Sequence, residues 1–190
     1  MDFMKIHKAV AFAAEAHDGQ VRKTSDIPYV THPYTAAMII QTFIQQVDFS
    51  EEQKTNIITA VLLHDVWEDT KTELKEIKDK FGDEVMTLVK GASEADKTKS
   101  WTERKTDTIN KAYEASLPLK YVICSDKIHN LISIQEGLHL SENEFWESFK
   151  KGRKEQNWYY ESLYQALTNN LNPIPPVFLE LKKQIDVVFG

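Results

Sequence analysis

The sequence predicts an all-α protein, a helical bundle of about nine or ten helices. Glycine and proline are scarce, with six of each in 190 residues, so few positions force a turn or interrupt a helix. Runs of alternating apolar and polar residues, which would indicate strands, are rare. A chain of this length with 42% hydrophobic residues is able to bury a core, and we expect one domain over residues 1–190.

The first half of the chain divides into five expected helices. Apolar side chains at helical spacing predict a first helix that ends before Gly19. Pro33 suits the first turn of a second helix, and Ser50 with Gln53 forms a capping box that begins a third. The expected ranges are 3–17, 33–46, 51–67, 70–79 and 83–92.

The second half begins with a polar stretch, residues 91–100, which we expect to be a mobile loop. Leu117 and Pro118 separate the next two helices, and a proline-rich segment that ends at Pro176 precedes a short last one. That helix is too short to be a separate domain, so we expect residues 142–189 to complete the same bundle. The expected ranges are 101–116, 119–136, 142–169 and a final helix after 176.

Charge and cysteine content exclude several classes of protein. A formal net charge of −6 argues against broad binding to nucleic acid or to acidic membranes, which basic surfaces drive. No apolar run of about 18 residues indicates a membrane span, and the N-terminus lacks the layout of a secretion signal. We therefore expect a cytoplasmic protein without nucleic-acid or membrane partners. The single cysteine, Cys124, excludes an intrachain disulfide, and the sequence predicts no oligomeric state.

The stretch from Val61 to Asp69 carries the clearest functional signal. His64, Asp65, Glu68 and Asp69 follow a strongly apolar run. On one helix these four side chains would fall at roughly 0°, 100°, 40° and 140°, so they would share a face. Unpaired carboxylates on a buried helix are costly, so a divalent cation, a basic partner or a wet cleft should accompany them.

A divalent metal requires several histidine and carboxylate ligands at one point. His64 and Asp65 supply two of them. Further candidates are His32, at the start of a helix, and Asp126, which follows the apolar run 121–124. These residues are far apart in the sequence, so only the fold is able to bring them together.

Glu68 and Asp69 lie one turn beyond the ligand pair, where a carboxylate orients water, accepts its proton or protonates a leaving group. Alternatives to a metal site stay open at this point. A histidine and an aspartate on a helix commonly form a hydrogen-bonded pair, His32 beside a proline suits a cap or loop, and Asp126 suits a polar cap. The other histidines are expected to be structural or exposed: His7, His17, His129 and His139.

Basic residues near these acids suggest a small anionic substrate. Arg22 and Lys23 follow a glycine turn and lie close in sequence to His32, so we expect them to bind phosphate. The sequence has no Gly-x-x-x-x-Gly-Lys loop, no Gly-x-Gly-x-x-Gly motif and no Gly-x-Ser-x-Gly elbow, so the common phosphate-cradling loops and the serine-hydrolase motif are unsupported. Further basic candidates, each more often a solvated surface charge, are Lys97, Lys99, Arg104, Lys105 and Lys127.

Four motifs, in their order and spacing, resemble the HD-domain hydrolases of the alarmone ppGpp. This family includes the hydrolase portions of RelA/SpoT-type enzymes and the stand-alone small alarmone hydrolases. The match covers about residues 5–135, and because the remaining length would not hold a synthetase domain, the chain is similar to the stand-alone form. The motifs are His17-Asp18-Gly19-Gln20-Val21-Arg22-Lys23, Pro28-Tyr29-Val30-Thr31-His32-Pro33, Leu62-Leu63-His64-Asp65-Val66-Trp67-Glu68-Asp69 and Ser125-Asp126-Lys127-Ile128-His129-Asn130-Leu131.

The resemblance implies an all-α HD-domain bundle and a Mn²⁺-dependent 3′-pyrophosphohydrolase that converts ppGpp to GDP and pyrophosphate. It implies that the ligands of one Mn²⁺ are His32, His64, Asp65 and Asp126. It implies that the catalytic carboxylates are Glu68 and Asp69. For the nucleotide it implies contacts from Arg22, Lys23 and Asn130 and, in less regular parts of the match, from Lys97, Arg104, Lys154 and Tyr159.

One departure from the family pattern bears on the substrate. Between the basic pair and Pro28 the family usually has a glycine, where this chain has Ser25-Asp26-Ile27. An added acid beside a phosphate-binding pair would weaken or change substrate preference. Two other functions stay open: hydrolysis of another nucleotide, such as NADPH or a nucleoside phosphate, and nucleotide sensing without turnover. The intact Glu68 and Asp69 favour an enzyme over a sensor.

Overall fold

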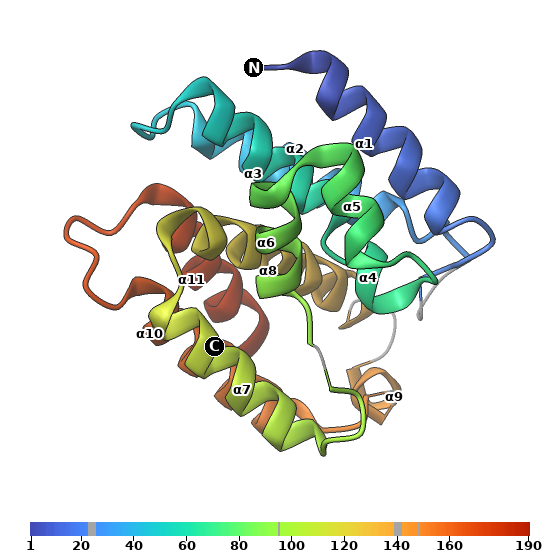
Figure 1. Cartoon of the computed structure of the whole chain (residues 1–190). Coiled ribbons are helices and arrows are strands. Elements are labelled where there is room, and N and C mark those ends of the chain that lie inside the picture. The colour runs from blue at the N-terminus through green and yellow to red at the C-terminus, as the bar shows by residue number, and fades with distance from the viewer. Residues whose placement is uncertain (23–25, 95, 139–141, 148) are drawn as a thin grey trace.

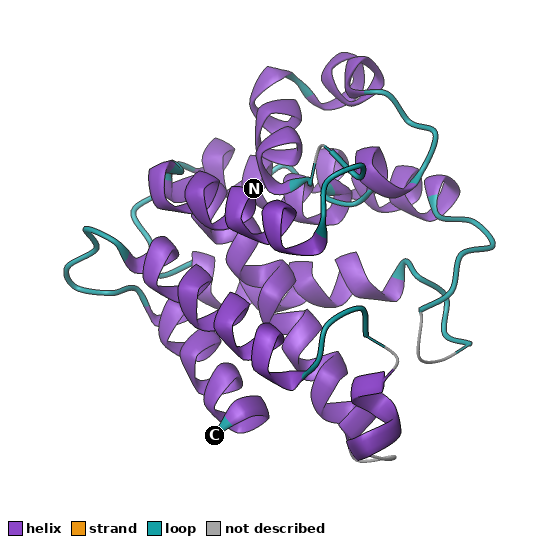
Figure 2. Cartoon of the chain, turned by 90° about the horizontal axis from the view of Figure 1, so that it is seen from below, coloured by secondary structure: helices purple, strands orange, loops and turns teal. Residues whose placement is uncertain are grey.

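The computed structural model describes residues 1–22, 26–94, 96–138, 142–147 and 149–190. In these residues every regular element is an α-helix (Figure 2). The described residues also include an isolated bridge between Val21 and Pro28. The all-α class predicted from the sequence is confirmed. The helices are α1 (Phe3–Ala16), α2 (Thr31–Ile44), α3 (Glu51–Leu63), α4 (Val66–Asp69), α5 (Leu74–Phe81), α6 (Asp83–Ala92), α7 (Trp101–Glu114), α8 (Leu117–Leu138), α9 (Glu142–Glu147), α10 (Arg153–Thr168) and α11 (Pro176–Phe189).

Two of the expected helices are each broken in two. The single helix predicted over residues 51–67 is wrong, because α3 ends at Leu63 and a turn at His64 and Asp65 precedes α4. The His64 carbonyl accepts a hydrogen bond from Ser93 Oγ at 3.2 Å, a buried contact with a residue distant in sequence. This tertiary contact favours the turn. The sequence gives no local signal for it, because residues 61–69 contain neither glycine nor proline.

The second break divides the helix predicted over residues 142–169 into α9 and α10. Gly152 precedes α10 with an extended backbone, at φ −75° and ψ −175°, so the helix cannot run through it. The glycine was an available signal for this boundary. The other expected helices are present, with ends displaced by a few residues, as is usual for helix boundaries.

α8 is the central helix of the bundle (Figure 1) and packs against α2, α3, α6 and α11. Its buried ring of Tyr121 lies edge-on to Phe49 and to Phe178, with centroids 5.3 and 5.4 Å apart. Segments from both halves of the chain therefore share one core, which supports the proposal of a single domain.

α3 carries the apolar run toward the centre of the protein. Its residues from Thr55 to Leu63 are all buried, and it contacts α1, α2, α6 and α8. A helix that is buried on every side is a rigid support for the turn that follows it. α7 and α10 lie side by side at another edge of the bundle (Figure 1). No helix in the described part of the chain has the length and hydrophobicity that crossing a membrane requires.

Candidate metal centre and active site

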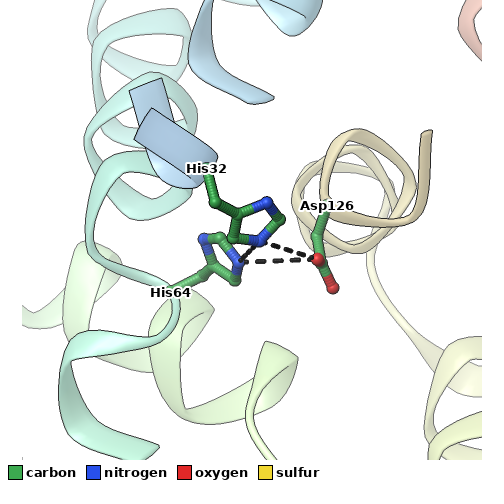
Figure 3. A group of neighbouring side chains, drawn as sticks. All are labelled: His32, His64 and Asp126. Carbon is green, nitrogen blue, oxygen red and sulfur yellow. Dashed lines mark hydrogen bonds and ion pairs between the residues drawn. The ribbon is translucent and has the colours of Figure 1, made fainter. Parts of the chain in front are cut away.

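Three buried side chains from distant parts of the sequence converge at the end of α3 (Figure 3). His32 lies in the first turn of α2, His64 directly follows α3, and Asp126 lies in the middle of α8. His32 Nε2 is 3.1 Å from His64 Nε2, and Asp126 Oδ1 is 3.2 Å from the first nitrogen and 3.6 Å from the second. The fold thus brings together the three predicted ligands that the sequence leaves farthest apart.

Asp65 adds a fourth group to this cluster. Its Oδ2 lies 3.1 Å from His64 Nε2 and 3.4 Å from His32 Nε2. Adjacent residues on a continuous helix point about 100° apart. His64 and Asp65 keep right-handed helical backbone angles in the turn between α3 and α4, and their Nε2 and Oδ2 atoms nevertheless converge on the same point.

The histidine tautomers suit a cation. His64 Nδ1 lies 2.7 Å from the Val61 carbonyl oxygen. Because a carbonyl oxygen only accepts hydrogen bonds, Nδ1 carries the proton, and in the neutral ring Nε2 is free to bind a metal. His32 Nδ1 lies 2.6 Å from His129 Nδ1, which leaves His32 Nε2 facing the centre. Two imidazole nitrogens and two carboxylates at these distances repel one another unless a positive charge lies among them. The donor set therefore fits one divalent cation.

The electrostatics of the centre favour a positive charge. Burial lowers the pKa of His64, but Asp65 and Asp126 outweigh this effect and raise the pKa well above its usual value. Burial raises the pKa of Asp126, but Lys127 and the two histidines outweigh it and hold the pKa well below its usual range. The negative charges of Asp65 and Asp126 that stabilise a proton on His64 would equally stabilise a divalent cation at the centre.

Each candidate carboxylate ligand is oriented by neutral or basic neighbours. The Tyr29 hydroxyl donates to Asp65 Oδ2 at 2.6 Å. Lys127 Nζ donates to Asp126 Oδ2 at 2.6 Å, and Asn130 Nδ2 donates to Asp126 Oδ1 at 2.5 Å. Such outer contacts fix the direction of the ligand oxygens and hold the carboxylates ionised.

Glu68 and Asp69 lie on α4, beside the centre. Glu68 is largely buried, and its Oε2 accepts the backbone N–H of Glu94 at 2.8 Å. Burial raises the pKa of Glu68, against the effect of that hydrogen bond. Asp69 Oδ1 accepts a hydrogen bond from Lys97 Nζ at 2.8 Å. A carboxylate with a raised pKa next to a metal centre is typical of a general base.

Arg22 and Asn130 lie at the same site. Arg22 Nη2 donates to Ser133 Oγ at 3.1 Å and to Asn130 Oδ1 at 3.5 Å, and its guanidinium lies over the Tyr29 ring, 5.6 Å from the centroid. Arg22 makes no ion pair among the described residues, so its charge is free to bind an anion. Lys23 lies outside the residues that the structure describes.

The remaining predicted nucleotide contacts are placed less directly. Lys97 contacts both members of the acidic pair, Glu68 and Asp69: besides its bond to Asp69, its Nζ donates to the Glu68 carbonyl at 2.8 Å. Arg104 Nη1 pairs with Glu94 Oε2 at 2.7 Å. Lys154 is exposed at the start of α10, and Tyr159 on the same helix is buried against Lys105, whose Nζ lies 4.8 Å from the ring centroid.

Three residues at the site were not predicted from the sequence: His129, Tyr29 and Glu94. His129 was expected to be structural or exposed, and it is partly buried against a candidate ligand. Its spacing of three from Asp126 places both on one face of α8 and was the available signal. Tyr29 stood within a matched motif, whereas nothing in the sequence marked Glu94.

The other histidines that the structure describes, His7 and His17, are not part of the centre. His7 is exposed, and His17 is buried, with its Nδ1 2.9 Å from Gln20 Oε1 and its ring 4.8 Å from that of Tyr29. His139 lies outside the described residues.

The fold and the centre define a class: an all-helical protein with a buried histidine and aspartate site for a divalent cation. The family model described as HD domain matches residues 9–139, which is more than half of the chain and includes every candidate metal ligand. The chain therefore belongs to the HD-domain family, and the resemblance seen in its motifs is confirmed.

Several curated relatives carry the name guanosine-3′,5′-bis(diphosphate) 3′-pyrophosphohydrolase. The MESH1 protein of Xenopus tropicalis is 37% identical over 131 residues, which cover 68% of this chain and 69% of the relative. The Borreliella burgdorferi protein is 34% identical over 136 residues, again 68% of this chain but only 19% of the relative. The chain thus spans about two thirds of the first of these proteins and about a fifth of the second.

Two solved structures share the fold over most of the chain. One, described as a metazoan ortholog of SpoT that hydrolyses ppGpp, is 25% identical with a TM-score of 0.74, and the match covers 96% of this chain and 94% of that one. A Listeria monocytogenes EGD-e protein is 36% identical with a TM-score of 0.72, and the match covers 88% and 99% of the two chains.

Proposed function

We propose that this protein is a Mn²⁺-dependent phosphohydrolase that removes the 3′-diphosphate of ppGpp, giving GDP and pyrophosphate. The observation that carries the proposal is the convergence of His32, His64 and Asp126 beside the acidic pair Glu68 and Asp69. The relatives named as ppGpp 3′-pyrophosphohydrolases support the choice of substrate. We propose the whole of residues 1–190 as one hydrolase domain.

In this proposal His32, His64, Asp65 and Asp126 hold the cation. When bound, a divalent cation polarises water and neutralises charge that develops on the phosphates. Glu68 accepts a proton from the attacking water, a role for which its raised pKa suits it. Water oxygen bonds to the phosphorus nearest the sugar, and the bond from that phosphorus to the 3′ oxygen breaks. In the same proposal Asp69 assists proton delivery to the departing 3′ oxygen.

The substrate phosphates would be held by basic and polar groups beside the candidate metal centre. We propose that Arg22 and Asn130 form one phosphate-binding pair. Arg22 is suited to this because it has no carboxylate partner among the described residues. We propose that Lys23 completes this phosphate-binding group. Lys97, Arg104, Lys154 and Tyr159 stay proposed contacts; of these, Lys97 and Arg104 already pair with acids and would have to exchange partners.

Incubation of the purified protein with ppGpp and Mn²⁺ tests the proposal, with GDP and pyrophosphate measured by ion-exchange chromatography. We expect both products in equal amounts and none from His64→Ala. Lys75→Ala, which changes an exposed ion pair on α5, is the matched control and should retain full activity. Absence of products with Mn²⁺, Mg²⁺, Co²⁺ and Zn²⁺ would contradict the proposal.

The exposed Asp26 gives a reason to include other nucleotides in the same assay. NADPH and nucleoside phosphates carry phosphates that an HD-type centre could attack, and an acid near Arg22 disfavours the most highly charged ligand. Faster release of phosphate from one of these would assign the site to that substrate. Saturable binding of ppGpp without product would instead indicate a sensor.

A further inference from the structure

Three residues that follow α6 contact the turn and the short helix that carry the candidate site. Ser93 Oγ donates to the His64 carbonyl at 3.2 Å. The Glu94 N–H donates to Glu68 Oε2 at 2.8 Å. Lys97 Nζ donates to the Glu68 carbonyl and to Asp69 Oδ1, both at 2.8 Å. Successive residues after α6 thus contact successive residues from His64 to Asp69. We call Ser93, Glu94 and Lys97 the tether, because together they hold the acidic pair in place.

The Glu94 side chain anchors the tether to α7. Its Oε2 accepts from Arg104 Nη1 at 2.7 Å, and its Oε1 accepts from Lys105 Nζ. The Glu94 side chain is only 12% exposed. Burial raises the pKa of Glu94, but Lys105 and Lys127 outweigh it and lower the pKa, so the group is ionised at neutral pH. Charge-assisted bonds of this kind are stronger and more directional than neutral ones.

α7 is itself held in place around this anchor. Lys111 Nζ donates to the Ser93 carbonyl at 3.2 Å, and Lys105 lies over the Tyr159 ring of α10. A helix that supplies no metal ligand and no proposed proton carrier therefore directs three basic side chains at the tether.

We propose that Glu94 is a positioning residue for Glu68: its ion pairs with α7 hold the Glu94 N–H against Glu68 Oε2 and so fix the direction of the other carboxylate oxygen. This inference rests on the proposed function, in which Glu68 accepts the proton of water. Glu94 touches neither water nor substrate in this role. The N–H occupies one oxygen of Glu68 and leaves Oε1 for the reaction.

A purely structural role for Glu94 makes a different prediction. A structural ion pair would stabilise the fold, and its loss would lower the fraction of active protein without altering the chemistry of Glu68. A positioning role requires Glu68 itself to change when the tether is released, because misplacement of a catalytic group lowers the rate by itself.

Glu94→Gln separates the two roles, because it keeps the size of the side chain and removes its charge. We expect kcat for ppGpp to fall on the order of 10- to 100-fold, with Mn²⁺ affinity unchanged. Lys105→Met keeps an apolar stem over Tyr159 and releases the same anchor from the other side. It should lower kcat in the same direction, and the double variant should be no worse than Glu94→Gln alone, because both substitutions break one contact.

The pKa of Glu68 in the metal-free protein gives a readout that needs no substrate. The charged groups that face Glu68 are Asp65 and Asp69 from its own segment and Glu94 and Lys97 from the tether. Removal of the Glu94 charge alone would lower the Glu68 pKa. Loss of the N–H bond would raise it, because the bond is the largest effect that opposes burial.

Carbon-13 NMR of labelled glutamate carboxyls measures this pKa, with the Glu68 signal identified by its absence in Glu68→Gln. An upward shift in Glu94→Gln is the expected result, and a downward shift or none would overturn the inference. Asp107→Asn is the matched control, since it removes the 2.7 Å ion pair between Lys99 and α7 without touching the acidic pair. Failure of the wild-type protein to hydrolyse ppGpp would overturn the proposed function, and the NMR result would still decide the role of Glu94.

Discussion

His129 Nδ1 lies 2.6 Å from Nδ1 of His32, a candidate metal ligand, with the two ring centroids 4.8 Å apart. One nitrogen must donate and the other accept. Burial, His32 and Arg22 lower the pKa of His129 to about 4, so this ring is neutral at physiological pH. Since a metal on His32 Nε2 requires the proton of that ring to be on Nδ1, metal binding would make His32 the donor and the neutral His129 the acceptor.

The first prediction is that His129→Leu weakens binding of Mn²⁺ by about 10- to 100-fold, because the His32 N–H loses its acceptor and the ring loses its orientation. Isothermal titration calorimetry on the metal-free protein measures the affinity. His129→Gln retains a carbonyl acceptor and should recover part of the loss. Equal affinities in the wild-type and His129→Leu proteins would show that His32 does not depend on this contact.

Part of this site was open to prediction from the sequence. Four ionisable groups after a buried apolar run marked residues 64–69 on physical grounds alone. His32 and Asp126 were candidate ligands by residue type and position, and only the family resemblance joined them to one site, because nothing local in the sequence connects residues 32, 64 and 126. Spacing along a chain gives contacts only within one helix, and these three lie on α2, after α3 and on α8.

The break between α3 and α4 could not have been predicted from local signals. Residues 61–69 contain no glycine or proline, and the turn is associated with the tertiary hydrogen bond from Ser93 to the His64 carbonyl. The break before α10 differs, because Gly152 marked it in the sequence. A tertiary contact overrides helix propensity in the first case, whereas in the second the low helix propensity of glycine agrees with the break.

The second prediction concerns protons. Asp65 and Asp126 raise the pKa of His64 well above its usual value, so the metal-free protein holds a proton there at pH 7. A metal requires the neutral ring, so binding should release that proton, and affinity should fall as the pH is lowered. Calorimetry at pH 7 in buffers of different ionisation enthalpy measures the release. A binding enthalpy that is independent of the buffer would contradict a protonated His64.

The third prediction is that Glu68→Gln lowers kcat by about 10²- to 10⁴-fold and leaves Mn²⁺ affinity unchanged. Glutamine keeps an oxygen that accepts the Glu94 N–H but cannot take a proton from water. Steady-state kinetics and calorimetry on the same preparation give both values. Asp79→Asn, at an exposed ion pair on α5, should change neither, and an active Glu68→Gln protein would remove Glu68 from the mechanism.

The fourth prediction tests the packing of α9 on α8. A Cβ at Gly137 would lie 1.9 Å from Cε2 of the Phe145 ring. That ring is buried and has the Phe149 ring 5.0 Å away, centroid to centroid, so it has little room to move. Alanine in place of glycine inside a helix is worth up to about 1 kcal/mol, whereas overpacking a buried contact costs about 1–3 kcal/mol. The clash should therefore win, and Gly137→Ala should lower the melting temperature by several degrees in a thermal scan followed by circular dichroism. Adding Phe145→Leu should restore part of the loss, because the shorter side chain gives the new methyl group space; a Gly137→Ala protein more stable than wild type would show that α9 moves aside at little cost.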